Sequence, residues 1–226
     1  MRPSRETTTT TEVRATAAVV AIPLLLVPFA LIAALVAGRW GPLHDLDETV
    51  THRLNEFALA HPGWVGVMDW WSLAFHPTTW RVAAAVLAVW LWRRRERAQA
   101  VFVVVAMTAG ALLGVLLKLL FGRHRPDLLD PVAQAAGYAF PSGHALTNAL
   151  GAAVFLMILL PMAGRWARVA LWPAAVGIPL VTAFSRVLLG VHWTSDVVGG
   201  LLLGVALAVL ARQIIERRRV PERPLG

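Results

Sequence analysis

Long apolar blocks alternate with short polar segments along the 226-residue chain. Several blocks have the length of a membrane-spanning helix, which takes about 20 apolar residues. In lipid every backbone polar group needs an internal partner, so spans of this kind are helices rather than open strands. The pattern therefore predicts an all-α polytopic membrane protein with six spans, at residues 17–37, 79–92, 98–121, 142–160, 169–189 and 194–211.

Polar tails flank these blocks. Residues 1–16 contain a run of threonines and predict a flexible N-terminal tail, while residues 213–226 are rich in arginine and predict a basic C-terminal tail. Six spans of about 20 residues would use about 120 residues, which leaves no room for a separate soluble domain. We therefore expect one six-span domain over residues 17–212.

The first apolar block and the segment after it differ from the other spans. The block at 17–37 follows positive charges, as a signal peptide does, but a signal-peptide core has about 7–15 apolar residues and this block is longer, which favours an uncleaved span. Residues 39–78 are too polar to cross hydrocarbon easily, and their tryptophans predict one or two short interfacial helices. The block at 79–92 is short and is expected to borrow length from the segment before it.

Composition narrows the class of protein further. Hydrophobic residues make up 58% of the chain and charged residues 15%, against about 45–50% and about 25% in soluble domains. A soluble enzyme, a disordered chain and a collagen-like fibre are thereby excluded. The chain has no cysteine, which excludes disulfides, thiolate metal sites and cysteine nucleophiles.

The net charge of +8 raises the question of nucleic acid, but the positions of the arginines indicate another role. Most lie at the ends of apolar blocks, where basic residues orient membrane proteins, and not on a basic face interleaved with aromatics. Fourteen of the 21 basic residues fall in the two tails and in the loops after the second and fourth spans. We therefore expect no nucleic-acid partner, cytoplasmic termini, and loops after the first, third and fifth spans outside a plasma membrane, in a chain of bacterial type.

Three short motifs concentrate the unusual polar residues at the expected outer ends of the spans. They are Lys-Leu-Leu-Phe-Gly-Arg-His-Arg-Pro at 118–126, Pro-Ser-Gly-His at 141–144, and Ser-Arg at 185–186 followed by His-Trp-Thr-Ser-Asp at 192–196. Ionisable groups near hydrocarbon are costly, so a group of them at one depth predicts a functional site.

The residue types in these motifs suit phosphoryl transfer. His192 and Asp196 are four residues apart and are expected on one face of a helix, where the carboxylate fixes the imidazole tautomer and frees the other nitrogen as a base or nucleophile. Ser142 and Gly143 begin a helix, whose free N–H groups favour an anion. A second histidine, His144, is placed to protonate a leaving oxygen. Three cations supply charge for the transferred phosphoryl group without a metal: Lys118, Arg125 and Arg186.

Together the motifs resemble those of the type 2 phosphatidic acid phosphatase superfamily of membrane lipid phosphatases. That family carries Lys-x6-Arg-Pro, Pro-Ser-Gly-His and Ser-Arg-x5-His-x3-Asp, and all three are present here in order and without substitution. The resemblance implies a metal-independent, cofactor-free hydrolase with His192 as the nucleophile that forms a phosphohistidine, Asp196 orienting it, and His144 as the general acid. It also implies that the phosphate is held by Lys118, Arg125, Ser142, Gly143 and Arg186.

The family suggests a membrane lipid phosphate as the substrate, such as phosphatidic acid, phosphatidylglycerol phosphate or a polyprenyl diphosphate like undecaprenyl diphosphate. A lipid phosphotransferase on the same scaffold, or a non-catalytic transporter or scaffold protein, are the alternatives. The sequence leaves the oligomeric state open. It also leaves Arg123 and His124 open between headgroup contacts and plain loop residues, and it favours ordinary interfacial roles for the histidines outside the motifs, namely His44, His52, His61 and His76.

Overall fold

A computed structural model describes residues 5–217, with side chains described for residues 20–216. Over this part of the chain every regular element is helical, which confirms the all-α prediction. Residues 1–4 of the expected N-terminal tail and 218–226 of the expected C-terminal tail lie outside the described residues. The helices are α1 (Arg5–Ala37), α2 (Gly41–Ala60), α3 (Pro62–Ala74), α4 (Pro77–Arg93), α5 (Arg97–Phe121), α6 (Gly143–Leu159), a 3₁₀ turn η1 (Leu160–Met162), α7 (Arg165–Leu188) and α8 (Thr194–Arg217).

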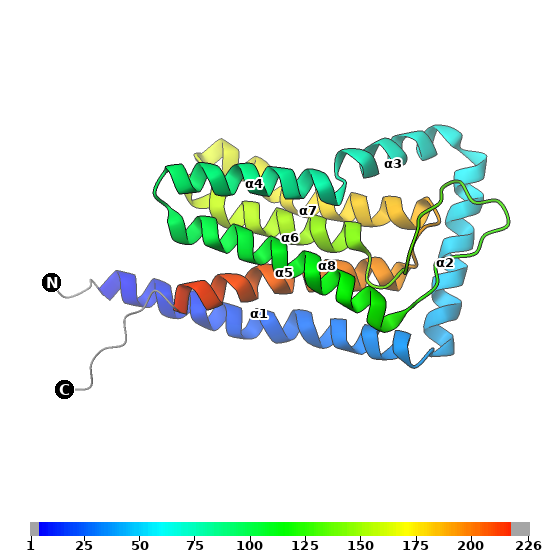
Figure 1. Ribbon diagram of the computed structural model, residues 1–226, viewed down its shortest axis with the longest axis horizontal. Helices are drawn as coiled ribbons and strands as arrows, with labels where there is room; N and C mark the ends of the chain where they lie inside the picture. The colour runs from blue at the N-terminus through cyan, green and yellow to red at the C-terminus, as the bar shows by residue number, and fades with distance from the viewer. Residues whose placement is uncertain (1–4, 218–226) are drawn as a thin grey trace.

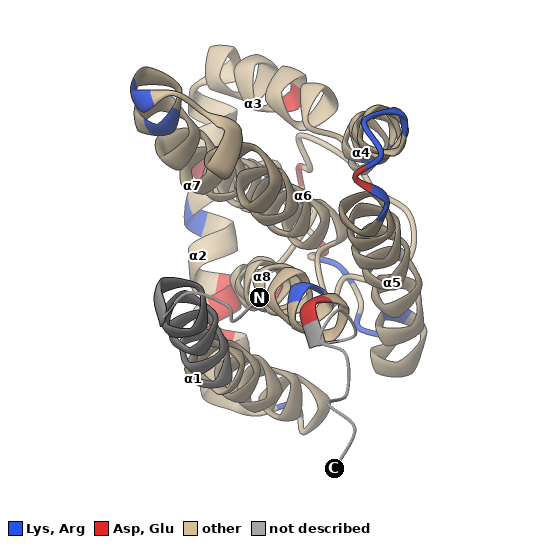
Figure 2. Cartoon of the chain, turned by 90° about the vertical axis from the view of Figure 1, so that its left-hand side faces the viewer, with Lys and Arg blue, Asp and Glu red and all other residues tan. Residues whose placement is uncertain are grey.

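The long helices run side by side, and α2 lies across one end of them (Figure 1). Seen along the bundle, α6 and α8 occupy the centre, and α1, α4, α5 and α7 surround them (Figure 2). In agreement, α6 packs against α4, α5, α7 and α8, while α8 packs against α1, α5, α6 and α7. The central pair therefore carries most of the bundle's internal contacts.

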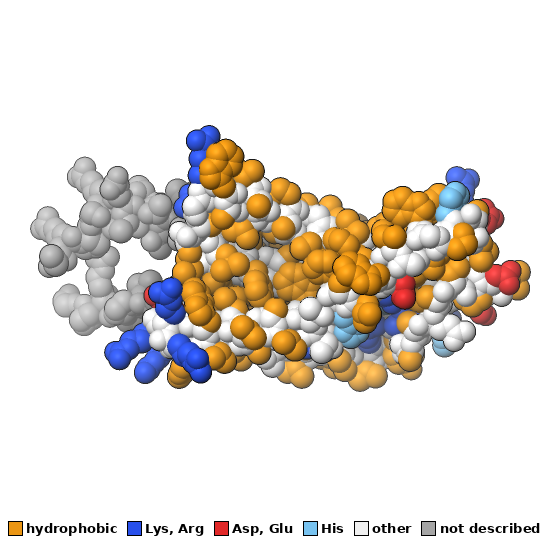
Figure 3. Space-filling view, turned by 90° about the horizontal axis from the view of Figure 1, so that it is seen from above, with side chains coloured by type: hydrophobic (Ala, Val, Ile, Leu, Met, Phe, Trp, Pro, Cys, Tyr) orange, Lys and Arg blue, Asp and Glu red, His pale blue; other side chains and the backbone are white. Residues whose placement is uncertain are grey.

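Five helices are long and apolar enough to cross a membrane: α1, α5, α6, α7 and α8. The expected sixth span falls on α4, which has 17 residues and a length of roughly 25 Å, less than the hydrocarbon thickness of about 30 Å. On the face shown in Figure 3, a broad hydrophobic band lies between one end with Lys and Arg side chains and another end that bears histidines and acidic residues beside further basic ones. The structure thus supports a multi-span membrane protein with five candidate spans.

The helix ends follow the apolar blocks closely, with two extensions. α1 begins at Arg5, inside the segment expected to be a polar tail, and α8 continues to Arg217, beyond the expected end of the last span at residue 211. Hydrophobicity marks where lipid is met, but the polar residues Arg212, Gln213 and Glu216 are good helix formers and continue the helix past that point.

Two glycines on α8 allow the central helices to approach each other closely. A Cβ built on Gly204 would lie 2.5 Å from the carbonyl oxygen of Leu146, and one on Gly200 would lie 2.8 Å from the carbonyl oxygen of Ser142. Glycines four residues apart are a common means of bringing membrane helices together. As a result the first turn of α6 lies beside the first turn of α8, and the Ser142 N–H donates to the Asp196 carbonyl at 3.0 Å.

We expect the Gly204→Val substitution to destabilise the protein by about 3 kcal/mol. This is the upper end of the usual cost of overpacking, because the new side chain would have to displace backbone atoms. Thermal unfolding of the purified protein, followed by circular dichroism, measures the loss. Gly177→Val on α7 is the matched control, since a Cβ there meets no atom within 4 Å. Equal stability of the two variants would contradict a close α6–α8 contact.

Candidate active site

A buried histidine and a buried aspartate lie where α7 ends and α8 begins. His192 Nδ1 is 3.4 Å from Asp196 Oδ2, and the Trp193 N–H donates to the same oxygen at 2.9 Å. The side chains of His192 and Asp196 are 2% and 0% exposed. The sequence led us to expect both on one helical face, but α8 starts at Thr194, so His192 lies in the preceding turn and Asp196 reaches back to it.

The hydrogen bonds of His192 fix which ring nitrogen is free. Arg125 Nη1 lies 3.1 Å from His192 Nε2, and a guanidinium has only N–H donors. Nε2 must therefore act as the acceptor, and Nδ1 carries the proton that faces Asp196. The imidazole thus holds an unprotonated Nε2 toward a cationic group, which is the state required of a nucleophile or base.

The surroundings of His192 also keep it neutral. Burial lowers the pKa of this imidazole to about 4, and the charges of Arg125 and Lys118 act in the same direction, while Asp196 opposes them. At neutral pH the folded protein therefore carries His192 without a charge.

Two cations from the first motif face the segment that connects α5 and α6. Lys118 Nζ, in the last turn of α5, donates to the Tyr138 carbonyl at 2.5 Å. Arg125 donates from Nε to the Gly137 carbonyl at 2.9 Å and from Nη2 to the Ala136 carbonyl at 3.0 Å. These neutral carbonyls leave the charges uncompensated, so both side chains remain suited to an anion.

The second motif forms the first turn of α6 beside them. Ser142 is the N-cap, and its Oγ accepts from the Ala145 N–H at 3.5 Å. Gly143 follows, and a Cβ built on it would lie 3.9 Å from Lys118 Cε. Since the first N–H groups of a helix lack intrahelical partners, this turn presents donors next to the Lys118 ammonium.

The third cation approaches from α7. Arg186 donates through Nη1 to Ser72 Oγ on α3, and its buried Nε has no hydrogen-bond partner among the described residues. His144 lies within electrostatic range of Arg186, His76 and His192, and its ring packs edge to face on His76 at 5.0 Å between centroids. His144 thus lies near Arg186 and the nucleophile candidate, with His76 against its ring.

All eight residues selected from the sequence lie near the end of α5, the start of α6, the end of α7 or the start of α8, and these helix ends are at the end of the bundle that α2 crosses (Figure 1). Direct contacts link Arg125 with His192 and His192 with Asp196. Backbone contacts join the first turns of α6 and α8. The arrangement brings one imidazole nitrogen, a second imidazole, three cations and helix N–H donors to one end of the bundle.

Several residues near this site were missed by the sequence analysis. Arg123, left open between a headgroup contact and a loop residue, is instead bound to two buried carboxylates, Asp47 and Asp196. His76 was assigned an ordinary interfacial role, yet it packs on His144. The available signal was the four-residue spacing of small polar residues in α2, where Asp47, Thr51 and Asn55 are all buried.

Residues 99–219 match the model of the PAP2 superfamily. The chain is 30% identical over 156 residues to the undecaprenyl-diphosphatase of Sulfolobus acidocaldarius, covering 66% of this chain and 69% of that protein. It is 36% identical over 109 residues to phosphatidylglycerophosphatase B of Bacillus subtilis, covering 47% of this chain and 53% of that protein.

A solved structure has the same fold. The crystal structure of the transmembrane PAP2-type phosphatidylglycerolphosphate phosphatase from Bacillus subtilis superposes with a TM-score of 0.75 and covers 89% of this chain and 98% of that one. The two sequences are 22% identical over the match, so the likeness concerns the arrangement of helices.

Proposed function

The chain belongs to the PAP2 superfamily, and we propose that it is a membrane lipid phosphate phosphatase that works through a covalent phosphohistidine on His192. The observation that carries this proposal is the contact of Arg125 Nη1 with His192 Nε2 at 3.1 Å. It sets an unprotonated ring nitrogen beside a group that binds phosphate oxygens in two-pronged fashion. A phosphate held by Arg125 would therefore have its phosphorus within reach of Nε2.

In the first step the Nε2 lone pair attacks phosphorus, the P–N bond forms, and the bond from phosphorus to the lipid oxygen breaks. His144 donates its proton to that oxygen, which leaves as the lipid alcohol or lipid phosphate. A bound phosphate dianion favours the protonated form of this imidazole. Asp196, through the Nδ1 proton, stabilises the positive charge that develops on the His192 ring.

In the second step water attacks the phosphorus of the phosphohistidine and the P–N bond breaks. His144, now neutral, takes the proton from the water, and inorganic phosphate leaves. The same residue thus serves as acid and then as base, and the enzyme returns to its starting state.

The transferred phosphoryl group spreads its negative charge over three oxygens. We assign these oxygens to Lys118, Arg125 and Arg186, together with Ser142 and Gly143 at the start of α6. The unpartnered buried Nε of Arg186 supports this assignment, since a phosphate oxygen would satisfy it. The donors that now meet the carbonyls of residues 136–138 would turn to the ligand.

We place the protein in a plasma membrane as a six-span chain with cytoplasmic termini and an extracytoplasmic site. α4 would be the sixth span, because its outward residues Val82, Val86 and Val89 are apolar and exposed. α2 and α3 would lie in the headgroup layer. The arginines of the α4–α5 turn and of the start of α7 gather at the end away from the site (Figure 2), as expected for a cytoplasmic face.

The substrate class follows from the relatives and from the position of the site. One relative is an undecaprenyl-diphosphatase and another a phosphatidylglycerophosphatase, so we propose a lipid phosphate monoester or diphosphate. The broad apolar band beside the site-bearing end (Figure 3) suits a substrate that stays in the bilayer.

The test is a panel of lipid phosphates offered to the detergent-purified protein with a chelator present. We expect phosphate release from at least one of phosphatidic acid, phosphatidylglycerol phosphate and undecaprenyl diphosphate. Acceptor alcohols are added in parallel, and free phosphate is expected to remain the product. A requirement for a divalent metal would refute the metal-independent mechanism, and transfer of the phosphate to the alcohols would indicate a phosphotransferase.

A further inference from the structure

Four polar side chains from three separate segments meet behind the nucleophile. Arg123, which follows α5, donates from Nη1 to Asp196 Oδ1 and to Ser195 Oγ, and from Nη2 to Asp47 Oδ2, at 2.7 Å each. Asp47 on α2 also accepts from the Ser195 N–H at 2.9 Å and from Ser195 Oγ at 2.5 Å. We term Asp47, Arg123, Ser195 and Asp196 the Arg123 network.

We propose that Asp47 and Arg123 are positioning residues for the reaction, acting on His192 through Asp196. This inference rests on the proposed function, since it takes His192 as the nucleophile. Neither residue contacts Nε2. Asp47 lies outside the three motifs, and Arg123 occupies a position of the first motif that the family signature leaves open. Their effect would pass through the orientation and charge of one carboxylate.

The orientation of Asp196 is determined by its two oxygens. Oδ1 accepts from Arg123, while Oδ2 accepts from the Trp193 N–H and faces His192 Nδ1. If Arg123 were absent, Oδ1 would lose its donor in a site where a buried acceptor needs one. The carboxylate could then rotate, and the Nδ1 proton of His192 would lose a fixed partner.

Asp47 in turn fixes Arg123. Its Oδ2 accepts from the guanidinium and from the Ser195 hydroxyl, its Oδ1 accepts from the Ser195 N–H, and its side chain is 0% exposed. The Trp193 ring packs beside the Arg123 guanidinium, whose Cζ lies 5.6 Å from the ring centroid. The Trp193 Nε1–H donates to the His124 carbonyl at 2.9 Å. Arg123 therefore has little freedom to move away from Asp196.

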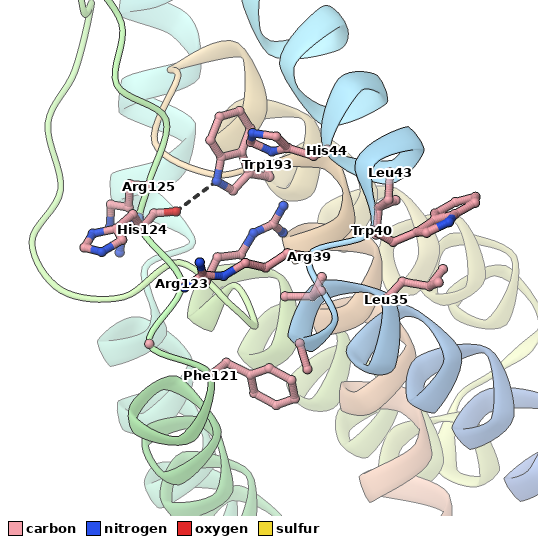
Figure 4. A pocket seen from close by; sticks show the side chains of 13 residues that line it. Leu35, Arg39, Trp40, Leu43, His44, Phe121, Arg123, His124, Arg125 and Trp193 are labelled. Carbon is pink, nitrogen blue, oxygen red and sulfur yellow. Dashed lines mark hydrogen bonds between the residues drawn. The ribbon is translucent and has the colours of Figure 1, made fainter.

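Figure 4 shows that Arg123 and Arg125 extend in different directions from the segment after α5. Arg123, His124 and Arg125 all line a cavity of about 610 Å³ together with Arg39 and Trp193, and the side chain of Arg123 leaves the 122–125 segment on the opposite side from those of His124 and Arg125. Arg125 is thus the arginine that faces His192 Nε2, and Arg123 is the one that faces the back of Asp196. The two arginines of the Gly-Arg-His-Arg sequence have distinct tasks.

The network also sets charge near the nucleophile. One guanidinium lies between two buried carboxylates, so the group is net negative beside His192, which favours the charge that develops on the ring during attack. Charged and titratable groups that face His192 are Asp196 from α8, Arg125 from the segment after α5, Lys118 from α5 and His144 from α6. A change at Asp47 or Arg123 therefore alters the charge near His192 through Asp196 and leaves the other three groups in place.

The test compares Asp47→Asn, Arg123→Gln and Arg123→Lys in the detergent-purified protein, with kcat, KM and melting temperature measured for each. We expect kcat to fall roughly 10- to 100-fold for Asp47→Asn and Arg123→Gln, with KM changed by less than about threefold, since each removes a transition-state interaction. Arg123→Lys keeps the positive charge but loses the planar set of guanidinium N–H donors, so its kcat should lie between those of Arg123→Gln and the wild type. The matched controls are Asp45→Asn and Arg53→Gln, whose side chains are exposed on α2, the helix that carries Asp47.

Two further readouts separate positioning from a merely structural role. In an Asp196→Asn background, Arg123→Gln should lower kcat by less than about twofold more, because both changes act through one carboxylate. The acid limb of the kcat/KM profile should move to higher pH in Arg123→Gln, since a cation is lost, and to lower pH in Asp47→Asn, since an anion is lost.

Each of three results would overturn the inference. A kcat loss that stays multiplicative in the Asp196→Asn background would show that Arg123 does not act through Asp196. A rise in KM with kcat unchanged would make Arg123 a substrate contact, and unchanged kcat in folded variants would leave the network with a structural role. Full activity of His192→Ala would instead refute the proposed function itself, which keeps the two failures distinct.

Discussion

The His192→Ala substitution is expected to lower phosphate release from a lipid phosphate by at least about 10⁴-fold, because loss of a nucleophile removes the covalent route altogether. The expectation rests on the free Nε2 beside Arg125. The decisive measurement uses substrate with a radiolabelled terminal phosphate, with the reaction stopped in alkali, where a phosphohistidine is stable. The wild-type protein should carry label during turnover and the variant should carry none.

His52→Ala is the matched control, since His52 is exposed on α2. It should keep both turnover and labelling. Label on protein that lacks the His192 imidazole would assign the covalent intermediate to another residue, and substantial turnover without any label would point to direct attack by water.

The His144→Asn substitution is expected to cost about 10²–10⁴ in rate for a lipid alcohol leaving group, which is the usual contribution of a general acid. The cost should be much smaller for an aryl phosphate such as nitrophenyl phosphate, because its leaving oxygen departs without a proton. The measurement is the burst of released alcohol in the first turnover, which isolates the step in which the acid acts from the later hydrolysis.

His52→Asn serves again as the control for a histidine lost outside the site. If the His144→Asn variant lost the same factor with both leaving groups, proton donation to the leaving oxygen would be ruled out as its role. A loss that appears only after the burst would place His144 in hydrolysis of the phosphohistidine alone.

The helices of the bundle could be predicted because the physical cause acts locally. Apolar blocks of sufficient length mark α5, α6, α7 and α8, whose ends lie within a few residues of the expected ones except at the C-terminal end of α8. α4 shows the limit of this reasoning: a helix forms where a span was expected, but its 17 residues fall below the usual length of a span. Local pattern identifies a helix more securely than it identifies how that helix meets lipid.

The site could be predicted only in part, for a related reason. The motif residues could be identified because ionisable side chains are unusual at the ends of apolar blocks. The structure gathers them at one end of the bundle. The four-residue spacing of Asp47, Thr51 and Asn55 indicates a buried face of α2 but names no partner, and the partner of Asp47, Arg123, lies 76 positions away. Their pairing depends on how α2 crosses the bundle. The turn at His192 is another case, because i and i+4 spacing does not state where a helix begins.

The glycine contact between α6 and α8 bears on how this scaffold can diversify. Where backbones touch, as at Gly200 and Gly204, almost any new side chain is excluded, so mutations that survive selection must accumulate elsewhere. The peripheral helices α1, α4 and α7 present free outer faces and can change with little penalty. Descendants of one ancestral catalyst can therefore come to accept different hydrophobic tails while the reacting groups keep their mutual geometry.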